Sequence, residues 1–364
     1  DGRNVRAEMG AGAGVWRAGR EHRCCESASC GRQVAGAAVA MAFYHGPVSD
    51  HFDGEHFYNS PNGMPHGGGS VVKWLANREP GPWPKWIDAA PGPPPPERVS
   101  DGGLRVTFVG HSTVLIQMDG VNILCDPIWS KRASPVSFAG PRRHRAPGIR
   151  FEQLPPIDLV LQSHDHYDHF DVPTLRRIAS QWRPRFGVPL GVAQRLISKR
   201  IAPPEQIREL DWWQSAEAFD KLRITAVPAR HFSGRSLRDR NKTLWCGYVI
   251  EGYSGTVYFA GDTGSGAHFR GIGARFPQIR LAFLPIGAYR PEWFMGPVHI
   301  SPEDAVRAHE EVGAATSVAI HFGTFHLADD GQDEPVVELQ RALDARKTAH
   351  RFWVLDAGEG RDVP

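Results

Sequence analysis

The stretch from Ser163 to Asp171 constrains the fold of this chain more than any other, because it places three histidines and a carboxylate within six positions behind an apolar run. The run, residues 157–161, reads Ile-Asp-Leu-Val-Leu, which is typical of a buried strand in a sheet covered on both faces. Asp171 is followed by Val172 and Pro173, which predicts an N-cap residue with proline in the first helical turn. The side chains of this stretch therefore project from a rigid strand end, where open α/β sheets place their chemistry.

The spacing within this stretch favours a metal site. In an extended segment residues two apart share a face, so His164 and His166 can reach one ion, while the bend after them presents Asp168 and His169 to another. A solvated loop rich in histidine and a single structural zinc ion are the simpler alternatives. The density of the pattern behind a buried strand favours a site for two metal ions.

Composition narrows the classes of protein to consider. The 364 residues include 42 basic and 40 acidic ones, and the net charge of +2 argues against binding to nucleic acid or anionic membranes through bulk charge. No run of about 18 apolar residues is present, so no membrane span is predicted. The five cysteines do not resemble a disulfide framework, and Cys125 and Cys246 are expected to be buried, reduced thiols.

The chain divides into three segments by composition. Residues 1–40 are rich in Gly, Ala and Arg, and we expect a disordered extension, which is not native if the methionine that follows it is the true start. Residues 41–100 mix aromatics with prolines and are expected to form an arm that packs on the core. Residues 101–364 are expected to form the catalytic domain.

Strand and helix signals alternate through this last segment. Asp119-Gly120 is a hairpin turn signal, and Ser301 is expected to cap a helix. The order suggests two similar halves, which two sheets packed face to face with helices outside would satisfy. The predicted strands are 104–109, 113–118, 121–125, 157–161, 185–188, 222–228, 244–252, 256–260, 281–286, 317–320 and 352–355, and the predicted helices are 172–180, 192–199, 302–312 and 334–343.

Three further candidate ligands follow predicted strands: His231, Asp262 and His321. Any one of them alone would be explained as a polar residue at a strand end. Together with the stretch from Ser163 to Asp171 they complete two sets of ligands. A basic stretch, residues 131–150, is either a solvated loop or a rim that receives an anion beside the metal site.

The order of these ligands resembles that of the metallo-β-lactamase superfamily, and further motifs are similar to those of the N-acyl-phosphatidylethanolamine-hydrolysing phospholipase D family. The resemblance runs from about residue 50 to the C-terminus. The motifs are Gly110-His111-Ser112-Thr113-Val114, Asp126-Pro127-Ile128, Arg132-Ala133-Ser134-Pro135, Gly140-Pro141, Pro285-Ile286-Gly287-Ala288-Tyr289, Trp293-Phe294-Met295 and His321-Phe322-Gly323-Thr324-Phe325.

The resemblance implies an α/β fold, an αββα sandwich of two mixed β-sheets flanked by helices, with two Zn²⁺ ions per chain. Manganese or iron in place of zinc is left open. One ion would be held by His164, His166 and His231, the other by Asp168, His169 and His321, with Asp262 bridging them. The site would then carry a net positive charge, which suits a phosphodiester anion.

The implied reaction is attack of a metal-bridging hydroxide on phosphorus in an N-acyl-phosphatidylethanolamine-like phospholipid, releasing phosphatidic acid and an N-acylethanolamine. Asp168, Asp262 and His299 would be catalytic, and His299 would orient the phosphate or donate a proton. A lactone or amide hydrolase on the same metal site and a metal-binding protein without catalysis are the alternatives.

Other residues are assigned supporting roles. His111, Asp126 and Asp165 are expected to hydrogen-bond the ligating imidazoles and fix their tautomers. We expect a phospholipid-like substrate and no nucleic acid, in a cytoplasmic protein for which peripheral membrane contact and a homodimer are left open. The residues that would line an apolar entrance for an acyl chain, or else belong to the core, are Tyr289, Trp293, Phe294 and Met295.

Overall fold

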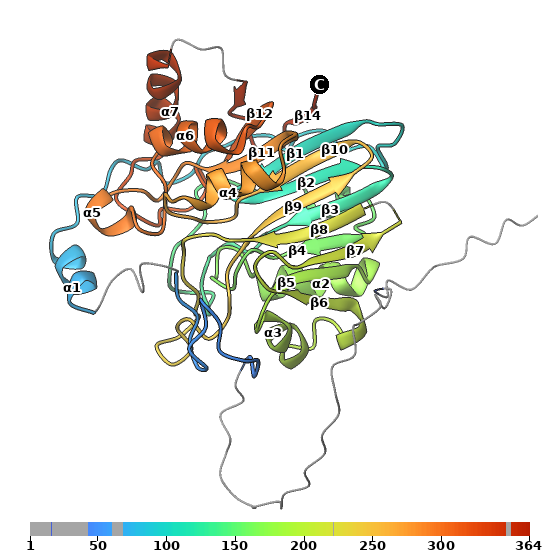
Figure 1. Cartoon of the computed structure of the whole chain (residues 1–364). Helices are drawn as coiled ribbons and strands as arrows, with labels where there is room; N and C mark the ends of the chain where they lie inside the picture. The colour runs from blue at the N-terminus through green and yellow to red at the C-terminus, as the bar shows by residue number, and fades with distance from the viewer. Residues whose placement is uncertain (1–15, 17–42, 60–67, 221, 347–350) are drawn as a thin grey trace, which may run out of the picture.

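Two mixed β-sheets pack face to face in this computed structural model, and helices cover their outer faces (Figure 1). The structure describes residues 16, 43–59, 68–220, 222–346 and 351–364. The first sheet, in spatial order, contains β14 (Gly360–Asp362), β1 (Leu104–Gly110), β2 (Thr113–Met118), β3 (Val121–Cys125), β4 (Leu159–Leu161), β5 (Arg185–Pro189) and β6 (Ile207–Leu210). The second contains β13 (Phe352–Trp353), β12 (Thr316–Ile320), β11 (Ile279–Pro285), β10 (Gly255–Phe259), β9 (Gly247–Gly252), β8 (Leu222–Val227) and β7 (Ser215–Phe219).

The two sheets repeat one plan. In the first, β1, β2 and β3 are antiparallel neighbours, and β3 to β6 run parallel. In the second, β7 to β10 are antiparallel, and β10 to β13 run parallel. Apolar side chains from both sheets, among them Ile116, Leu161, Ile250 and Phe283, form the core between them. The predicted αββα sandwich is confirmed.

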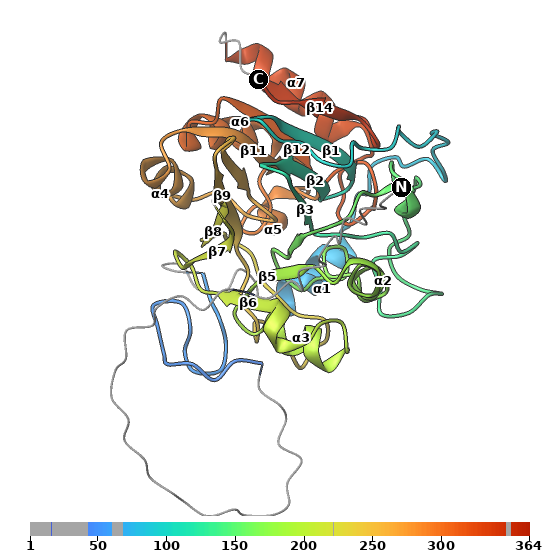
Figure 2. The same ribbon diagram turned by 90° about the vertical axis from the view of Figure 1, so that its right-hand side faces the viewer.

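Amphipathic helices bury one face each against the outer sides of the sheets (Figure 2). Leu175 of α2 (Val172–Trp182) and Leu196 of α3 (Val192–Ser198) are buried in the cluster that covers the first sheet. Ile272 of α4 (His268–Arg275), Val306 of α6 (Pro302–Val312) and Leu339 of α7 (Glu334–Ala345) are buried in the cluster on the second. No helix in the described ranges is long and apolar enough to span a membrane.

The predicted capping residues behave differently. The Ser301 side chain accepts a hydrogen bond from the Asp304 backbone N–H at 3.2 Å, so its capping role is confirmed. Asp171 precedes α2 with proline in the first turn, but its carboxylate makes no capping hydrogen bond. It accepts instead from the backbone N–H and the hydroxyl of Ser130 and from the Thr174 hydroxyl, so it ties the preceding loop to the helix.

Segments before residue 100 pack on the sandwich. Phe52 and Phe57 are buried against Trp245, and the indole Nε1 of Trp74 donates to the Asp329 carboxylate at 3.2 Å. Trp74 belongs to α1 (Gly68–Ala76), which contacts α5 (Glu292–Met295) where the Trp74 and Phe294 rings stack at 5.0 Å. The prediction for residues 1–40 lies outside the described residues apart from Trp16, whose Nε1 donates to the Gln206 carbonyl at 3.0 Å.

Candidate metal centre

The predicted ligands meet at one edge of the sandwich, where strands of both sheets end. The stretch from Ser163 to Asp171 follows β4, and the ligands of the second half follow β8, β10 and β12 directly or within a few residues. Gly261 has a φ of +62°, and a Cβ on it would lie 2.6 Å from the Ser163 Cβ. Glycine at this position therefore lets the loop that carries Asp262 approach the stretch from Ser163 to Asp171.

Three imidazoles form the first group of ligands. The Nδ1 atom of His166 lies 2.9 Å from Nε2 of His164 and 3.1 Å from Nε2 of His231. Their ligand atoms lie within 4.8 Å of one another, which is the spacing of a site for one ion.

A carboxylate and two imidazoles form the second group. Oδ2 of Asp168 lies 3.4 Å from Nε2 of His169 and 3.5 Å from Nε2 of His321. Oδ2 of Asp262 lies 3.1 and 3.0 Å from the same two nitrogens. Because this oxygen is also within 3.9 Å of Nε2 of His164 in the first group, Asp262 lies between the two groups.

Buried atoms without hydrogen bonds show that the residues fit metal ions. Nε2 of His169, Nε2 of His321 and Oδ1 of Asp262 are buried and have no hydrogen-bond partner among the residues that the structure describes. The close nitrogen-oxygen distances among these residues lack hydrogen-bond geometry, as expected when ligand atoms face a common cation rather than each other. Imidazole and carboxylate donors suit zinc, and also manganese and iron.

The electrostatics of the centre differ between the two groups. Burial lowers the pKa of His164 and of His231 well below its ordinary value, so these imidazoles are neutral and able to bind a cation. Burial also acts on His321, but the Asp262 and Asp168 carboxylates outweigh it and raise its pKa to about 9. The second group therefore attracts positive charge, either as a proton or as a metal ion.

Hydrogen bonds from outside the cluster orient the ligating rings. Nδ1 of His169 donates to the buried carboxylate of Asp126 at 2.7 Å, and Nδ1 of His231 donates to the Val298 carbonyl at 3.0 Å. Each bond leaves Nε2 of its ring free for a metal ion. The structure thus places Asp126 where the sequence analysis expects it.

The two other expected supporting residues differ from each other. Nε2 of His111 lies 2.9 Å from Oδ2 of Asp168, and its ring lies 4.3 Å from that of His321, so His111 hydrogen-bonds a candidate carboxylate ligand and packs against a candidate imidazole ligand. Burial lowers the pKa of His111 to about 4. Asp165 pairs with Arg195 and accepts from the Gly234 backbone N–H at 2.8 Å. The expectation that it hydrogen-bonds an imidazole is wrong, because its two carboxylate oxygens accept from the Arg195 guanidinium and from the Gly234 backbone N–H instead.

A pocket of about 320 Å³ opens onto the metal ligands. Among the residues assigned to an acyl entrance, Phe294 and Met295 line it, whereas Tyr289 is buried elsewhere and Trp293 is 47% exposed outside it. The sequence analysis misses the rest of the wall, although Phe232 directly follows a ligand. The unpredicted lining residues are Val71, Trp74, Phe232, Arg240, Val298 and Leu327.

His299 lies in this pocket beside the centre. Its ring lies 5.1 Å from that of His231 and 5.2 Å from that of His321, measured between centroids. Nδ1 of His299 is buried and has no hydrogen-bond partner in the described part of the chain, and burial lowers the pKa of the ring to about 3. A neutral imidazole with a free nitrogen is therefore available to a bound substrate.

The basic stretch 131–150 does not line the pocket. Arg143 is buried and donates to the Ser130 and Ile128 carbonyls, which is a structural role. Lys131 and Arg132 line a separate cavity of about 620 Å³ on the far side of the metal loop.

This constellation at the edge of an αββα sandwich defines a class of protein. Residues 121–322, which contain all seven candidate ligands, match the family model described as Beta-lactamase superfamily domain. The chain belongs to the metallo-β-lactamase superfamily.

Particular relatives narrow the comparison. The chain is 38% identical over 71% of its length to N-acyl-phosphatidylethanolamine-hydrolyzing phospholipase D 1 of Caenorhabditis elegans, 76% of which is covered. It is 45% identical over 66% of its length to an uncharacterized protein of Mycobacterium tuberculosis, and it spans 64% of that relative. A metallo hydrolase of the archaeon Ignicoccus hospitalis shares the fold, with a TM-score of 0.54 and 23% identity over 72% of this chain and 99% of its own.

Proposed function

We propose that this protein is a dinuclear zinc phosphodiesterase that hydrolyses an N-acyl-phosphatidylethanolamine-like phospholipid to phosphatidic acid and an N-acylethanolamine. The similarity to the nematode phospholipase D supports the substrate class. The two groups of ligands joined by Asp262 support a pair of metal ions.

One observation carries the proposal: the pocket has polar metal ligands at its floor and apolar side chains on its wall. Val71, Trp74, Phe294, Met295 and Leu327 form the apolar wall. A phosphodiester that carries an acyl chain would place its phosphate at the floor and its chain against this wall.

The residues of the chain have distinct tasks in this reaction. When bound, the zinc ions supply an activated water and stabilise the charge that develops on the phosphoryl oxygens. His299, which offers a ring nitrogen within 4.8 Å of a carboxylate oxygen of Asp262, orients a phosphoryl oxygen by hydrogen bonding. Asp126 and the Val298 carbonyl keep the ligating rings in the correct tautomer.

Exposed apolar side chains beside the pocket support contact with a lipid surface. Val72 and Leu75 of α1 are 67% and 58% exposed, and Trp293 of α5 is 47% exposed. Their neighbours Val71, Trp74 and Phe294 line the pocket, so a lipid substrate would pass from this surface to the centre without crossing bulk water.

Hydrolysis in ¹⁸O-labelled water tests the proposal. The zinc-loaded protein is incubated with N-acyl-phosphatidylethanolamine, and the products are analysed by mass spectrometry. We expect label in the phosphate of phosphatidic acid. Label in a carboxylate product would show attack at a carbonyl and would move the assignment to a lactone or amide hydrolase.

A further inference from the structure

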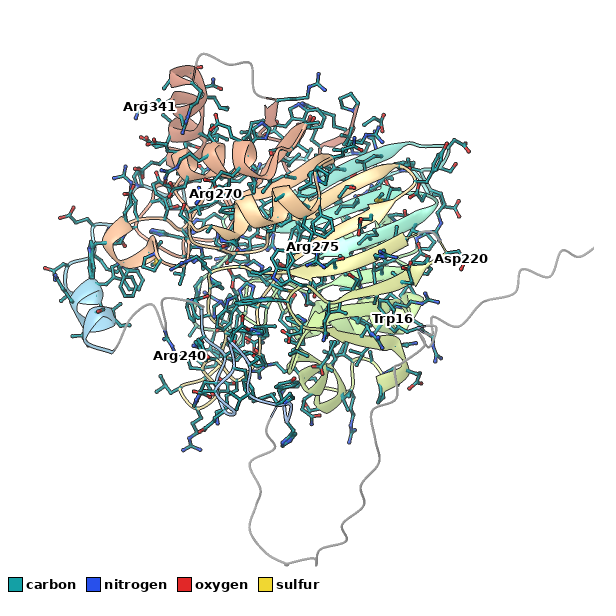
Figure 3. The ribbon with its side chains drawn as sticks, viewed as in Figure 1. Trp16, Asp220, Arg240, Arg270, Arg275 and Arg341 are labelled. Atoms are coloured by element: carbon teal, nitrogen blue, oxygen red, sulfur yellow. The ribbon has the colours of Figure 1, made fainter. Side chains whose placement is uncertain are left out.

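Arg240 is the one lysine or arginine among the described residues that line the pocket at the metal centre. It lies in the loop between β8 and β9, and its side chain is labelled in Figure 3. The other charged side chains of the pocket, Asp168 and Asp262, belong to the metal ligands.

The backbone around Arg240 is fixed on both sides. The Asp239 carboxylate accepts from the backbone N–H groups of Arg235 and Ser236 at 2.9 and 2.6 Å, and Asn241 donates its backbone N–H to the Ser233 carbonyl at 2.9 Å. These hydrogen bonds close the loop on itself and hold the backbone on both sides of Arg240.

Glycine allows this closure. Gly234 has a φ of +137°, and a Cβ on it would lie 3.0 Å from Cα of Arg240. A larger residue would be strained in this backbone conformation and would crowd Arg240.

An aromatic ring separates the guanidinium of Arg240 from the centre. The guanidinium carbon lies 4.8 Å from the centroid of the Phe232 ring, and that ring packs against the ligand His166 with 4.5 Å between centroids. Arg240 therefore points its charge at the part of a substrate that extends one ring away from the metal ligands.

This charge has no carboxylate partner within ion-pair distance among the described residues. Arg195, in contrast, is paired with Asp165 and with Asp239. Burial lowers the pKa of Arg240 from its ordinary value, and no neighbouring charge opposes this effect. A partly desolvated, unpaired guanidinium is a favourable partner for an anionic oxygen.

We propose that Arg240 is a specificity-determining residue that binds a second acidic group of the substrate, a carboxylate or a phosphate, outside the metal centre. The inference rests on the proposed function, since it takes the scissile phosphodiester to occupy the metal centre. It adds that, within the N-acyl-phosphatidylethanolamine-like class, phosphodiesters with a further negative charge on their alcohol are preferred over N-acyl-phosphatidylethanolamine itself, whose alcohol is neutral.

Three matched substrates test this: p-nitrophenyl ethyl phosphate, p-nitrophenyl carboxyethyl phosphate and p-nitrophenyl phosphoethyl phosphate. With the zinc-loaded wild type we expect KM for at least one of the acidic diesters to be about tenfold lower than for the ethyl diester. The two acidic diesters distinguish a carboxylate from a phosphate ligand. Arg240→Gln should abolish the preference with little change in kcat, and Arg240→Lys should retain part of it.

Arg238→Gln is the matched control, because Arg238 lies in the same loop, is exposed and does not line the pocket. Its kinetics should equal those of the wild type. Circular dichroism shows whether Arg240→Gln is folded. If it is not, the KM values of Arg240→Lys for the acidic and ethyl diesters are compared with those of the wild type instead.

Calorimetric binding of the ethyl, carboxyethyl and phosphoethyl monoesters of benzylphosphonate separates the two proposals, because it needs no turnover. If the wild type binds neither acidic phosphonate more tightly, or if the preference survives Arg240→Gln, the role of Arg240 is refuted. If the tighter binding of an acidic phosphonate depends on Arg240 but no diester is hydrolysed, the phosphodiesterase assignment is refuted, whereas the role of Arg240 in binding an anion is supported.

Discussion

Asp126→Asn should separate metal binding from folding, because the Asp126 carboxylate contacts a metal ligand without being one. One carboxylate oxygen accepts from Nδ1 of His169 and from the Ser163 hydroxyl, and the other accepts from the Ser163 backbone N–H and the Gln162 side chain. An asparagine can serve only one of these pairs with its oxygen. Its NH₂ group would face the other pair as donor against donor.

The magnitude follows from the bonds that are lost. If the NH₂ group faces His169, it favours the tautomer of the imidazole that carries its proton on Nε2. Nε2 is the atom that should bind the metal. We expect one of the two zinc ions to bind on the order of 10–100-fold more weakly. The free energy of unfolding of the metal-free protein should fall by roughly 2–4 kcal/mol, since two hydrogen bonds to a charged group are lost.

Asp171→Asn is the matched control for this experiment. The Asp171 carboxylate is also buried, at the end of the loop that carries His169, and it also accepts four hydrogen bonds, from Trp129, Ser130 and Thr174, none of which comes from an imidazole. Its substitution should lower stability by a similar amount and leave zinc affinity unchanged. Competition with a chromophoric chelator measures the affinity. Equal losses of affinity in both variants, or none in Asp126→Asn, would refute the reasoning.

Three other predictions concern the centre and the arm. Elemental analysis after zinc loading should find about two zinc ions per chain, and a value near one would contradict the dinuclear site. Asp262→Asn should lower turnover on the order of a hundredfold or more while the circular dichroism stays that of the wild type; activity within a few-fold of wild type would show that Asp262 does not link the two groups. Hydrogen bonds to Asp211 and Asp50 outweigh burial and raise the pKa of His51 above 6.5, so the stabilisation that His51 provides is fully present below that pH and is lost as the pH rises through the raised value. His51→Gln should therefore reduce the free energy of unfolding more at about pH 5.5 than at about pH 9 in denaturant titrations; an equal loss at both would disprove the linkage.

The sequence predicts the layers and the metal ligands for the same physical reason. Strands buried on both faces read as continuous apolar runs, and β2 and β3 have the predicted bounds of 113–118 and 121–125. The ligands stand out because each is polar directly behind such a run, where the chain leaves the core. The apolar runs and the polar residues behind them are both local features of the sequence, so they can be recognised without knowledge of the tertiary structure.

Elements that depend on tertiary contacts are missed. The strands β6 and β7 lie at the sheet ends: β6 has two adjacent charged residues, Arg208 and Glu209, and β7 buries only small alanines, so neither sequence has a strong apolar period. Helix α4 contains two glycines, which lower helix propensity, and it is stabilised by burying Phe269 and Ile272 against the second sheet.

The wall of the pocket is beyond prediction for a stronger reason: it is assembled from segments far apart in the chain. Trp74, which lines the pocket, is held by a hydrogen bond to Asp329, 255 residues away, and by stacking on Phe294. The local pattern of apolar residues cannot predict a contact between residues so far apart in the sequence. The two segments come together only when the sandwich has folded. The candidate metal ligands come from strand ends of the sandwich, whereas the wall comes from α1, α5, the loop that carries Arg240 and the segment after β12 that carries Leu327. These segments can change without disturbing the strands that hold the ligands, so one metal centre can serve different substrates when the surrounding segments differ.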